Sequence, residues 1–347
     1  MPQTQNRAVM NWLFIFAGIV AFLVVFGGFV RLTRSGLSIV EWNPISGSVP
    51  PMGEHDWERE FAKYQQTPEF IYVNSGMTLD DYKYIFYIEW IHRFIARLAG
   101  LVYAFPVFYF LFRKTIPWKE FGIYFLMGML FIGQAFMGWF MVASGLIDKP
   151  AVDHFRLTLH LLLALTLLGL ALWTAFGHRY GFSSPAKVKW SSLSKLAAAS
   201  FVILLIQISY GGLVAGLKAG HVSNTWPLML GQWIPKGIFG ANGFNWLNLF
   251  EAPQTVVYIH RWFAFLGLLL VPWAYWQAKK RNYPPEIQRG LLWLIVAVTT
   301  QITLGVTVVL TNVNVPVASI HQAGAVTLFW LAIFFIHRLR ALDFAKT

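Results

Sequence analysis

The sequence of 347 residues contains no cysteine and few charged residues, and both absences narrow what the protein can be. Without cysteine there is no disulfide, no thiolate metal site and no cysteine nucleophile, so histidine is left as the expected ligand for a metal or cofactor. Charged residues make up only 12% of the chain, well below the share in a soluble domain, whereas hydrophobic residues make up 57%. The composition therefore predicts an integral membrane protein.

Apolar stretches of about twenty residues, long enough as helices to cross a hydrocarbon core of about 30 Å, recur along the chain. They predict an all-α fold with eight transmembrane helices. The windows lie near residues 10–30, 89–112, 117–143, 156–177, 195–215, 255–277, 290–311 and 315–337. The first window lacks the small-residue cleavage site of a signal peptide, so we expect it to be a retained helix in a bacterial protein.

Basic residues outnumber acidic ones, 27 against 15, which gives a formal net charge of +12. They gather in short loops at alternating helix ends, and the positive-inside rule places those ends in the cytoplasm. Both termini are then cytoplasmic, and the long loops 31–88 and 216–254 lie outside. Orientation signals and contact with anionic membrane lipid explain the charge, so we expect no nucleic-acid partner.

The sequence repeats itself once, with the matched positions in the same order. The matched pairs are Gly27 and Gly211, Gly28 and Gly212, Arg34 and Lys218, Trp42 and Trp226, His92 and His260, Arg93 and Arg261, Gln134 and Gln301, Gly138 and Gly305, and His160 and His321. Each repeat holds four predicted helices, so both halves start on the same side of the membrane, with a pseudo-two-fold axis along the membrane normal. We predict two tandem-duplicated four-helix bundles, 1–177 and 195–347, joined by a cytoplasmic linker at 178–194.

Nine histidines are present, and four of them belong to the repeat. Ionisable groups inside a membrane are costly and usually face the interior of a helix bundle. One pair in each half, His92 with His160 and His260 with His321, would suit bis-imidazole ligation of a heme iron. The role of His154 stays open. Four further histidines are expected to face solvent or the membrane interface: His55, His178, His221 and His337.

Small residues near one helical turn from these histidines, such as Gly100 and Gly267, would either open a slot for a flat macrocycle or allow close helix packing. Gln134 and Gln301 are polar residues inside predicted helices, so each needs a partner, either at the site or on another helix. Heme propionates need cations or interfacial water. Candidate partners near the outer face are Arg34, Arg93, Lys218 and Arg261, with snorkelling to the interface as the alternative.

One acidic residue distinguishes the two halves. Glu89 precedes His92 by about one turn on the same helix face, whereas the second half has Val257 at the matching place. A carboxylate at a heme edge can act as a base or stabilise a developing cation. The alternative is an ion pair with Arg93 or Arg34. The first half is therefore predicted to be reactive and the second to hold a cofactor.

These motifs resemble the heme A synthase family over residues 20–340: Glu-x-x-His-Arg from Glu89, His-Arg from His260, the segment from Gly27 to Ser38, and Trp-Asn-Pro-Ile from Trp42. The resemblance implies oxidation of the C8 methyl group of heme O to a formyl group. The family does this by successive two-electron oxidations through a hydroxymethyl intermediate, with oxygen from water. The missing cysteine pair in loop 31–88 resembles the cysteine-free branch of proteobacteria and mitochondria.

The resemblance also implies roles for residues and partners. Glu89, His92 and His160 would be catalytic, with both histidines at the iron of the substrate heme, and His260 and His321 would ligate a heme b cofactor. Implied partners are heme O synthase and cytochrome oxidase assembly factors, in the bacterial cytoplasmic (inner) membrane. The electron acceptor and a homo-oligomeric state stay open. The alternatives are a di-heme b-type electron-transfer protein without formyl-forming activity, and a transporter built on a parallel repeat.

Overall fold

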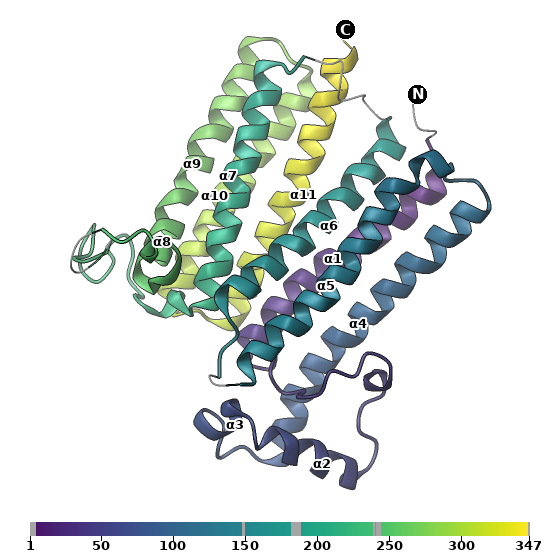
Figure 1. The fold of residues 1–347 in the computed structure, drawn as a ribbon. Coiled ribbons are helices and arrows are strands. Elements are labelled where there is room, and N and C mark those ends of the chain that lie inside the picture. The colour runs from purple at the N-terminus through teal and green to yellow at the C-terminus, as the bar shows by residue number, and fades with distance from the viewer. Residues whose placement is uncertain (1–4, 148–149, 182–188, 239, 241–243, 346–347) are drawn as a thin grey trace. The chain divides into compact units, whose positions relative to one another are not determined.

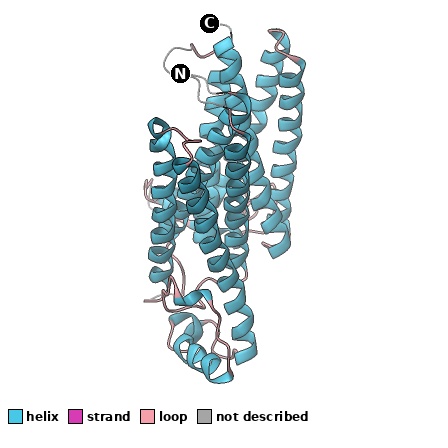
Figure 2. Ribbon diagram, turned by 90° about the vertical axis from the view of Figure 1, so that its right-hand side faces the viewer, coloured by secondary structure: helices cyan, strands magenta, loops and turns pink. Residues whose placement is uncertain are grey.

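The structure, a computed structural model, describes residues 5–147, 150–181, 189–238, 240 and 244–345. Over these residues it consists of helices joined by loops, without a strand (Figure 2). The long helices are α1 (Arg7–Leu32), α4 (Leu79–Phe112), α5 (Phe121–Gly145), α6 (His154–Tyr180), α7 (Ser192–Gly216), α9 (Pro253–Lys280), α10 (Pro285–Leu310) and α11 (Val315–Ala345). Eight helices in the described part of the chain are long and apolar enough to cross a membrane, which confirms the predicted number.

The chain divides into two compact units. The first unit is Gly18–Leu168, and the second unit combines the residues up to Ala17 with those from Gly169 onward. Helices α1 and α6 therefore each contribute residues to both units. The predicted division of the chain at residues 178–194 stays a prediction, and residues 182–188 of that linker lie outside the described residues.

In the second unit, α7, α9, α10 and α11 form a four-helix bundle in which each helix packs against two others (Figure 1). Apolar residues from all four helices meet near one end, among them Leu193, Ala278, Ile287 and Leu339. Their burial removes apolar surface from contact with water, which favours the bundle. At the same end Asp343 accepts hydrogen bonds from the Ser194 hydroxyl (2.6 Å) and the Ser191 amide (3.1 Å), tying α11 to the start of α7.

Helix α4 of the first unit begins at Leu79, earlier than the predicted start at residue 89. Thr78 and Asp81 form a capping box, in which each side chain accepts a hydrogen bond from the other residue's backbone amide. The added turns bury Tyr82 and Phe86 against Trp57 of the preceding loop. The hydropathy window missed them because this part of the helix packs on a loop and carries charged residues. Glu89 therefore lies inside a helix rather than at its start.

The two long loops, residues 31–88 and 216–254, contain short helices. The first long loop carries η1 (Ser46–Ser48), α2 (Glu54–Tyr64) and α3 (Pro68–Tyr72), and Figure 1 shows α2 and α3 beside the N-terminal end of α4. Burial raises the pKa of Tyr64 to about 12, so its phenol stays protonated. The second long loop carries η3 (Ala219–His221) and α8 (Asn248–Glu251).

The four histidines predicted to face solvent or the interface divide into two groups. His55 and His221 are exposed, as predicted. For His178 and His337 the prediction is wrong, because they are buried, with 5% and 3% of their surface exposed. The ring of His337 lies among three aromatic rings of the second unit, those of Trp173, Phe176 and Tyr180. Aromatic packing rather than water surrounds this helix end.

Candidate functional site

Each unit brings one pair of the repeated histidines together. In the first unit His92 of α4 and His160 of α6 lie close enough to interact electrostatically. In the second unit His260 of α9 and His321 of α11 do the same. All four imidazoles are partly buried within their helix bundles. Two imidazoles from different helices are what ligation of one iron from opposite faces of a flat macrocycle requires.

Each imidazole lies against a glycine on a neighbouring helix. A methyl group at Gly27 of α1 would lie 3.1 Å from Nε2 of His92, and one at Gly138 of α5 would lie 3.1 Å from Cε1 of His160. In the second unit the corresponding distances to Cε1 are 3.2 Å from Gly211 to His260 and 3.0 Å from Gly305 to His321. A methyl group at these distances would be tighter than most contacts in proteins, so each ring would have to shift by a few tenths of an ångström to admit it.

We expect Gly305→Ala to destabilise the second unit by about 1–3 kcal/mol, because the added methyl forces the His321 ring out of its place. The matched control is Gly267→Ala, where the methyl would meet Val298 at an ordinary 3.7 Å. That control should be neutral or stabilising, since alanine favours a helix over glycine. Thermal unfolding of both variants in detergent measures the difference, and equal unfolding temperatures would contradict the prediction.

The glycines expected to open a slot on the histidines' own helices have other neighbours. Gly100 faces the ring of Phe131 on α5, and Gly267 faces Val298 on α10. They allow close helix packing, which was the alternative interpretation. The glycines that do face the imidazoles were present in the sequence as matched pairs of the repeat, and the pairing of Gly138 with Gly305 was the available signal.

Buried polar atoms without a hydrogen-bond partner surround the histidine pairs. They include the side-chain oxygens of three glutamines and one ring nitrogen: Oε1 of Gln134, Gln207 and Gln301, and Nδ1 of His160. Such atoms are rare in folded proteins and suggest a missing partner. Among the described residues there is no group of three or more histidine, aspartate or glutamate side chains able to hold a bare metal ion. Paired imidazoles with unpaired amides beside them fit the ligation of a heme iron.

Glu89 is held by the first long loop. Its side chain is buried, and Oε2 accepts hydrogen bonds from the Ser38 amide (2.8 Å), the Ser38 hydroxyl (2.7 Å) and the Ile39 amide (3.0 Å). Oε1 accepts from Nη2 of Arg93 at 2.6 Å. The ion pair with Arg93, one of the two alternatives for this residue, is thus present. The carboxylate is fixed between α4 and the loop segment that follows α1.

The matching place in the second unit is apolar. Val257 is buried in a cluster with Ala219 and Met229, and Val222 packs against that cluster. Val222 follows Gly211 at the same spacing as Ser38 follows Gly27. The hydrogen-bonded pair of Ser38 and Glu89 is therefore matched by a pair of valines, and the second unit attaches its loop to the helix without a carboxylate.

The arginines that follow the two histidines bind the long loops. Arg93 donates from Nη2 to the carbonyl of Ile39 (3.2 Å), and Arg261 donates from Nη2 to the carbonyl of Ser223 (2.6 Å). Arg261 also donates to the carbonyl of Thr225 (3.1 Å), while its buried Nε has no partner. Both guanidinium groups thus bind the backbone of a long loop. The unpaired Nε of Arg261 is a donor from which a heme propionate would accept a hydrogen bond. The predicted propionate contacts stay a prediction.

Arg34 and Lys218 stand just beyond the ends of α1 and α7. Both are exposed and have left-handed backbone conformations, with φ of 56° and 53°. In the first unit the amide of Ser35 bonds back to the carbonyl of Val30 (2.9 Å), which closes the helix end. The same left-handed conformation recurs at Lys114 and Asn282, just beyond α4 and α9, so it is a way of ending helices here and does not by itself indicate a role for the charge. The predicted role of Arg34 and Lys218 at propionates stays a prediction.

Three further features do not include the four repeated histidines. His154 is the first residue of α6 and packs on the ring of Phe155, with its Nε2 buried and unpaired.

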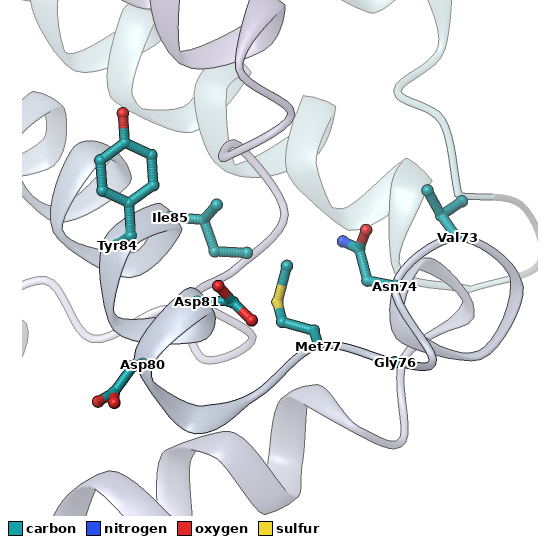
Figure 3. A pocket seen from close by; sticks show the side chains of 8 residues that line it. All are labelled: Val73, Asn74, Gly76, Met77, Asp80, Asp81, Tyr84 and Ile85. Atoms are coloured by element: carbon teal, nitrogen blue, oxygen red, sulfur yellow. The ribbon is translucent and has the colours of Figure 1, made fainter.

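A hollow of about 620 Å³ lies between residues 73–77 and the start of α4 (Figure 3). None of the eight side chains that line it is a histidine or another predicted site residue. A second hollow, of about 320 Å³, lies in the first long loop and is lined in part by Trp90, Arg93 and Arg97.

The whole chain is similar to known proteins. The COX15-CtaA family model, described as cytochrome oxidase assembly protein, matches residues 10–333. The chain is 41% identical over 340 residues to the heme A synthase of Parvibaculum lavamentivorans, with 96% of this chain and 95% of that protein covered. It is 40% identical over 333 residues to that of Maricaulis maris, covering 94% of each. For the enzyme of Wolbachia pipientis wMel the identity is 40% over 338 residues, covering 97% and 94%. Because the match spans both units and all four repeated histidines, the chain belongs to the COX15-CtaA family of cytochrome oxidase assembly proteins.

Proposed function

We propose that this chain is a heme A synthase, which oxidises the C8 methyl group of heme O to a formyl group through a hydroxymethyl intermediate. The observation that carries the proposal is the identity of about 40% with heme A synthases over nearly the full length of both proteins. The geometry adds a histidine pair in each unit and a buried carboxylate in one of them. The product would supply heme A to cytochrome oxidase.

The first unit is the proposed catalytic half. His92 and His160 would bind the iron of heme O. The two oxidations, first to a hydroxymethyl group and then to a formyl group, would take place beside Glu89. The first step removes two electrons from the methyl carbon and adds a hydroxyl group from water, with release of two protons. The second step does the same at the hydroxymethyl carbon, and the resulting diol loses water to leave the formyl group. A carbon that loses electrons develops positive charge, which a fixed carboxylate in a low-dielectric site stabilises strongly.

Glu89 is suited to this role because several hydrogen bonds fix the position of its carboxylate. Three donors fix Oε2, whereas Oε1 accepts one bond, from Arg93. Oε1 therefore carries fewer hydrogen bonds than Oε2 and keeps a position for the attacking water. The same oxygen would take the proton of that water as it adds. The electrons leave to an acceptor outside the chain.

The second unit is the proposed cofactor half. His260 and His321 would ligate a heme b, with Arg261 and Lys218 near its propionates and Arg34 and Arg93 in the corresponding places of the first unit. When bound, this heme supplies a redox-active iron. The apolar pair of Val222 and Val257 would keep the half free of a carboxylate, which suits a group that is held rather than changed.

Duplication of one four-helix unit is the proposed origin of this arrangement. The glycine contacts to the four imidazoles, the arginine contacts to loop carbonyls, and the left-handed residues after α1 and α7 recur at matched positions. These matched residues thus have corresponding contact partners, whereas Gln134 and Gln301 meet different ring nitrogens. The pseudo-two-fold axis along the membrane normal stays a prediction.

The proposed location is the bacterial cytoplasmic membrane, with both termini inside, as the positive-inside rule indicates. Heme O synthase and oxidase assembly factors are the proposed partners, since heme O carries a farnesyl chain and is best passed between membrane proteins.

Producing the full-length chain in a bacterial host that makes heme O but not heme A tests the function. We expect extracted pigment to contain heme A, identified by its formyl-shifted spectrum and its mass. The same host without the chain is the control. Two redox-active b-type hemes without any heme A would instead identify a di-heme electron-transfer protein.

A further inference from the structure

Two glutamines of the second unit contact its histidines in the same way. The Nε2 of Gln207, on α7, lies 3.1 Å from Nδ1 of His260 and 2.9 Å from the backbone oxygen of His260. The Nε2 of Gln301, on α10, lies 3.2 Å from Nδ1 of His321 and 2.8 Å from its backbone oxygen. Each amide therefore touches one edge of its imidazole and leaves the Nε2 edge uncovered. Both rings are fixed in the orientation that presents Nε2.

The first unit departs from this arrangement at both histidines. Gln134 lies 3.3 Å from Nε2 of His160, the opposite ring nitrogen, and Nδ1 of that ring is buried without a partner. The residue that matches Gln207 is Leu23, because each stands four positions before the glycine that faces the histidine. Leu23 meets His92 through its backbone, and its side chain has no group that could bond to the ring. The amide contact to Nδ1 thus belongs to the second unit alone.

Ligand chemistry gives this difference a consequence. A histidine that binds a metal through Nε2 carries its proton on Nδ1, and a partner that accepts this proton fixes the ring and strengthens the ligand. The Oε1 atoms of Gln207 and Gln301 are buried and unpaired. Rotation of each amide by half a turn would place Oε1 on the protonated Nδ1, in exchange for the present bond from Nε2 to the backbone oxygen of the histidine.

We propose that Gln207 and Gln301 are positioning residues that lock the two axial imidazoles onto the resident heme. The first unit has Leu23 in place of the first amide and Gln134 at the other nitrogen, so neither of its imidazoles has an amide on Nδ1 and we expect this unit to release a heme more readily. This division matches the needs of the two sites, because a cofactor stays bound while a substrate must enter and a product must leave. The inference rests on the proposed function for the identity of the two hemes.

Heme retention by the full-length protein, purified without a heme O source, tests the proposal. We expect Gln207→Leu and Gln301→Leu each to weaken heme b binding by about 10–100-fold, the loss typical when a metal ligand's hydrogen-bond partner is removed. The remaining heme should have a higher midpoint potential, because a less basic imidazole stabilises ferric iron less. Gln207→Glu should retain heme and lower that potential, since a carboxylate accepts the Nδ1 proton more strongly.

The matched control is Gln288→Leu on α10, which removes an amide that bonds to the Tyr283 carbonyl instead (2.8 Å). It should leave heme content and potential unchanged. The reciprocal variant Leu23→Gln should slow the exchange of heme from the first unit, measured by transfer to an excess of apomyoglobin. Unchanged retention and potential in Gln207→Leu and Gln301→Leu would overturn the proposal. Wild-type protein that retains heme b but forms no heme A would contradict the proposed function and leave this inference standing.

Discussion

Glu89→Gln should lower heme A formation by about 10²–10³-fold while the protein keeps its heme b. Glutamine has nearly the same shape and can still accept from Ser38 and Ile39, so the loop keeps its attachment. It removes the negative charge that would stabilise the electron-poor carbon, and losses of this size are typical when one stabilising group is taken from a reacting centre. Heme A per unit of purified protein, measured from extracted pigment, gives the result.

The Ser38→Ala variant tests the attachment of Glu89 to the loop without changing the charge of Glu89. It deletes the hydroxyl that donates to Oε2 at 2.7 Å but keeps the carboxylate and its pairing with Arg93. We expect a smaller loss than for Glu89→Gln, at most about 10–100-fold, since one hydrogen bond to a charged group contributes about 1.5–3 kcal/mol and the Ser38 amide remains. A Glu89→Gln protein with full heme A production would show that the carboxylate only holds the loop.

His260→Ala and His321→Ala should each remove heme b from the purified protein and abolish heme A formation. Losing an axial ligand costs more than losing a hydrogen-bond partner of that ligand, so we expect binding to weaken by more than about 100-fold. The absorption spectrum of the reduced protein reports the heme content. Because each imidazole fits against Gly211 or Gly305, alanine also leaves a gap there.

His92→Ala is the matched change in the first unit and should have a different outcome. The resident heme b should remain, with its spectrum unchanged, while heme A formation is lost because the substrate iron has lost a ligand. Circular dichroism of all the variants checks that the helices persist. If His92→Ala removed the resident heme and His260→Ala did not, the assignment of the two units would be reversed.

Periodicity and hydropathy predicted the eight long helices because a membrane-crossing helix must be apolar over about twenty residues. Helix α4 shows the limit of this signal. Its first turns carry Asp80, Asp81 and Lys83 and are stabilised by a capping box and by packing on Trp57, none of which raises hydropathy. His337 shows the same limit at a helix end, where aromatic neighbours bury a residue that composition assigns to water.

The repeat predicted which histidines belong together but not what surrounds them. Gln207 could not be found in this way, since its partner position is Leu23 and the repeat therefore breaks there. Arg93 and Arg261 were found, yet their contacts to the carbonyls of Ile39 and Ser223 depend on how each long loop folds back over its helix.

By itself the sequence determined the helical membrane fold, the paired histidines and the single carboxylate, because hydrophobic length, repetition and residue type are local or pairwise properties of the chain. Only the tertiary structure decided which nitrogen of each imidazole meets an amide, which glycine admits each ring, and how Glu89 is held. Those contacts join helices and loops far apart in the sequence, and their distances follow from packing that no pattern of residues contains.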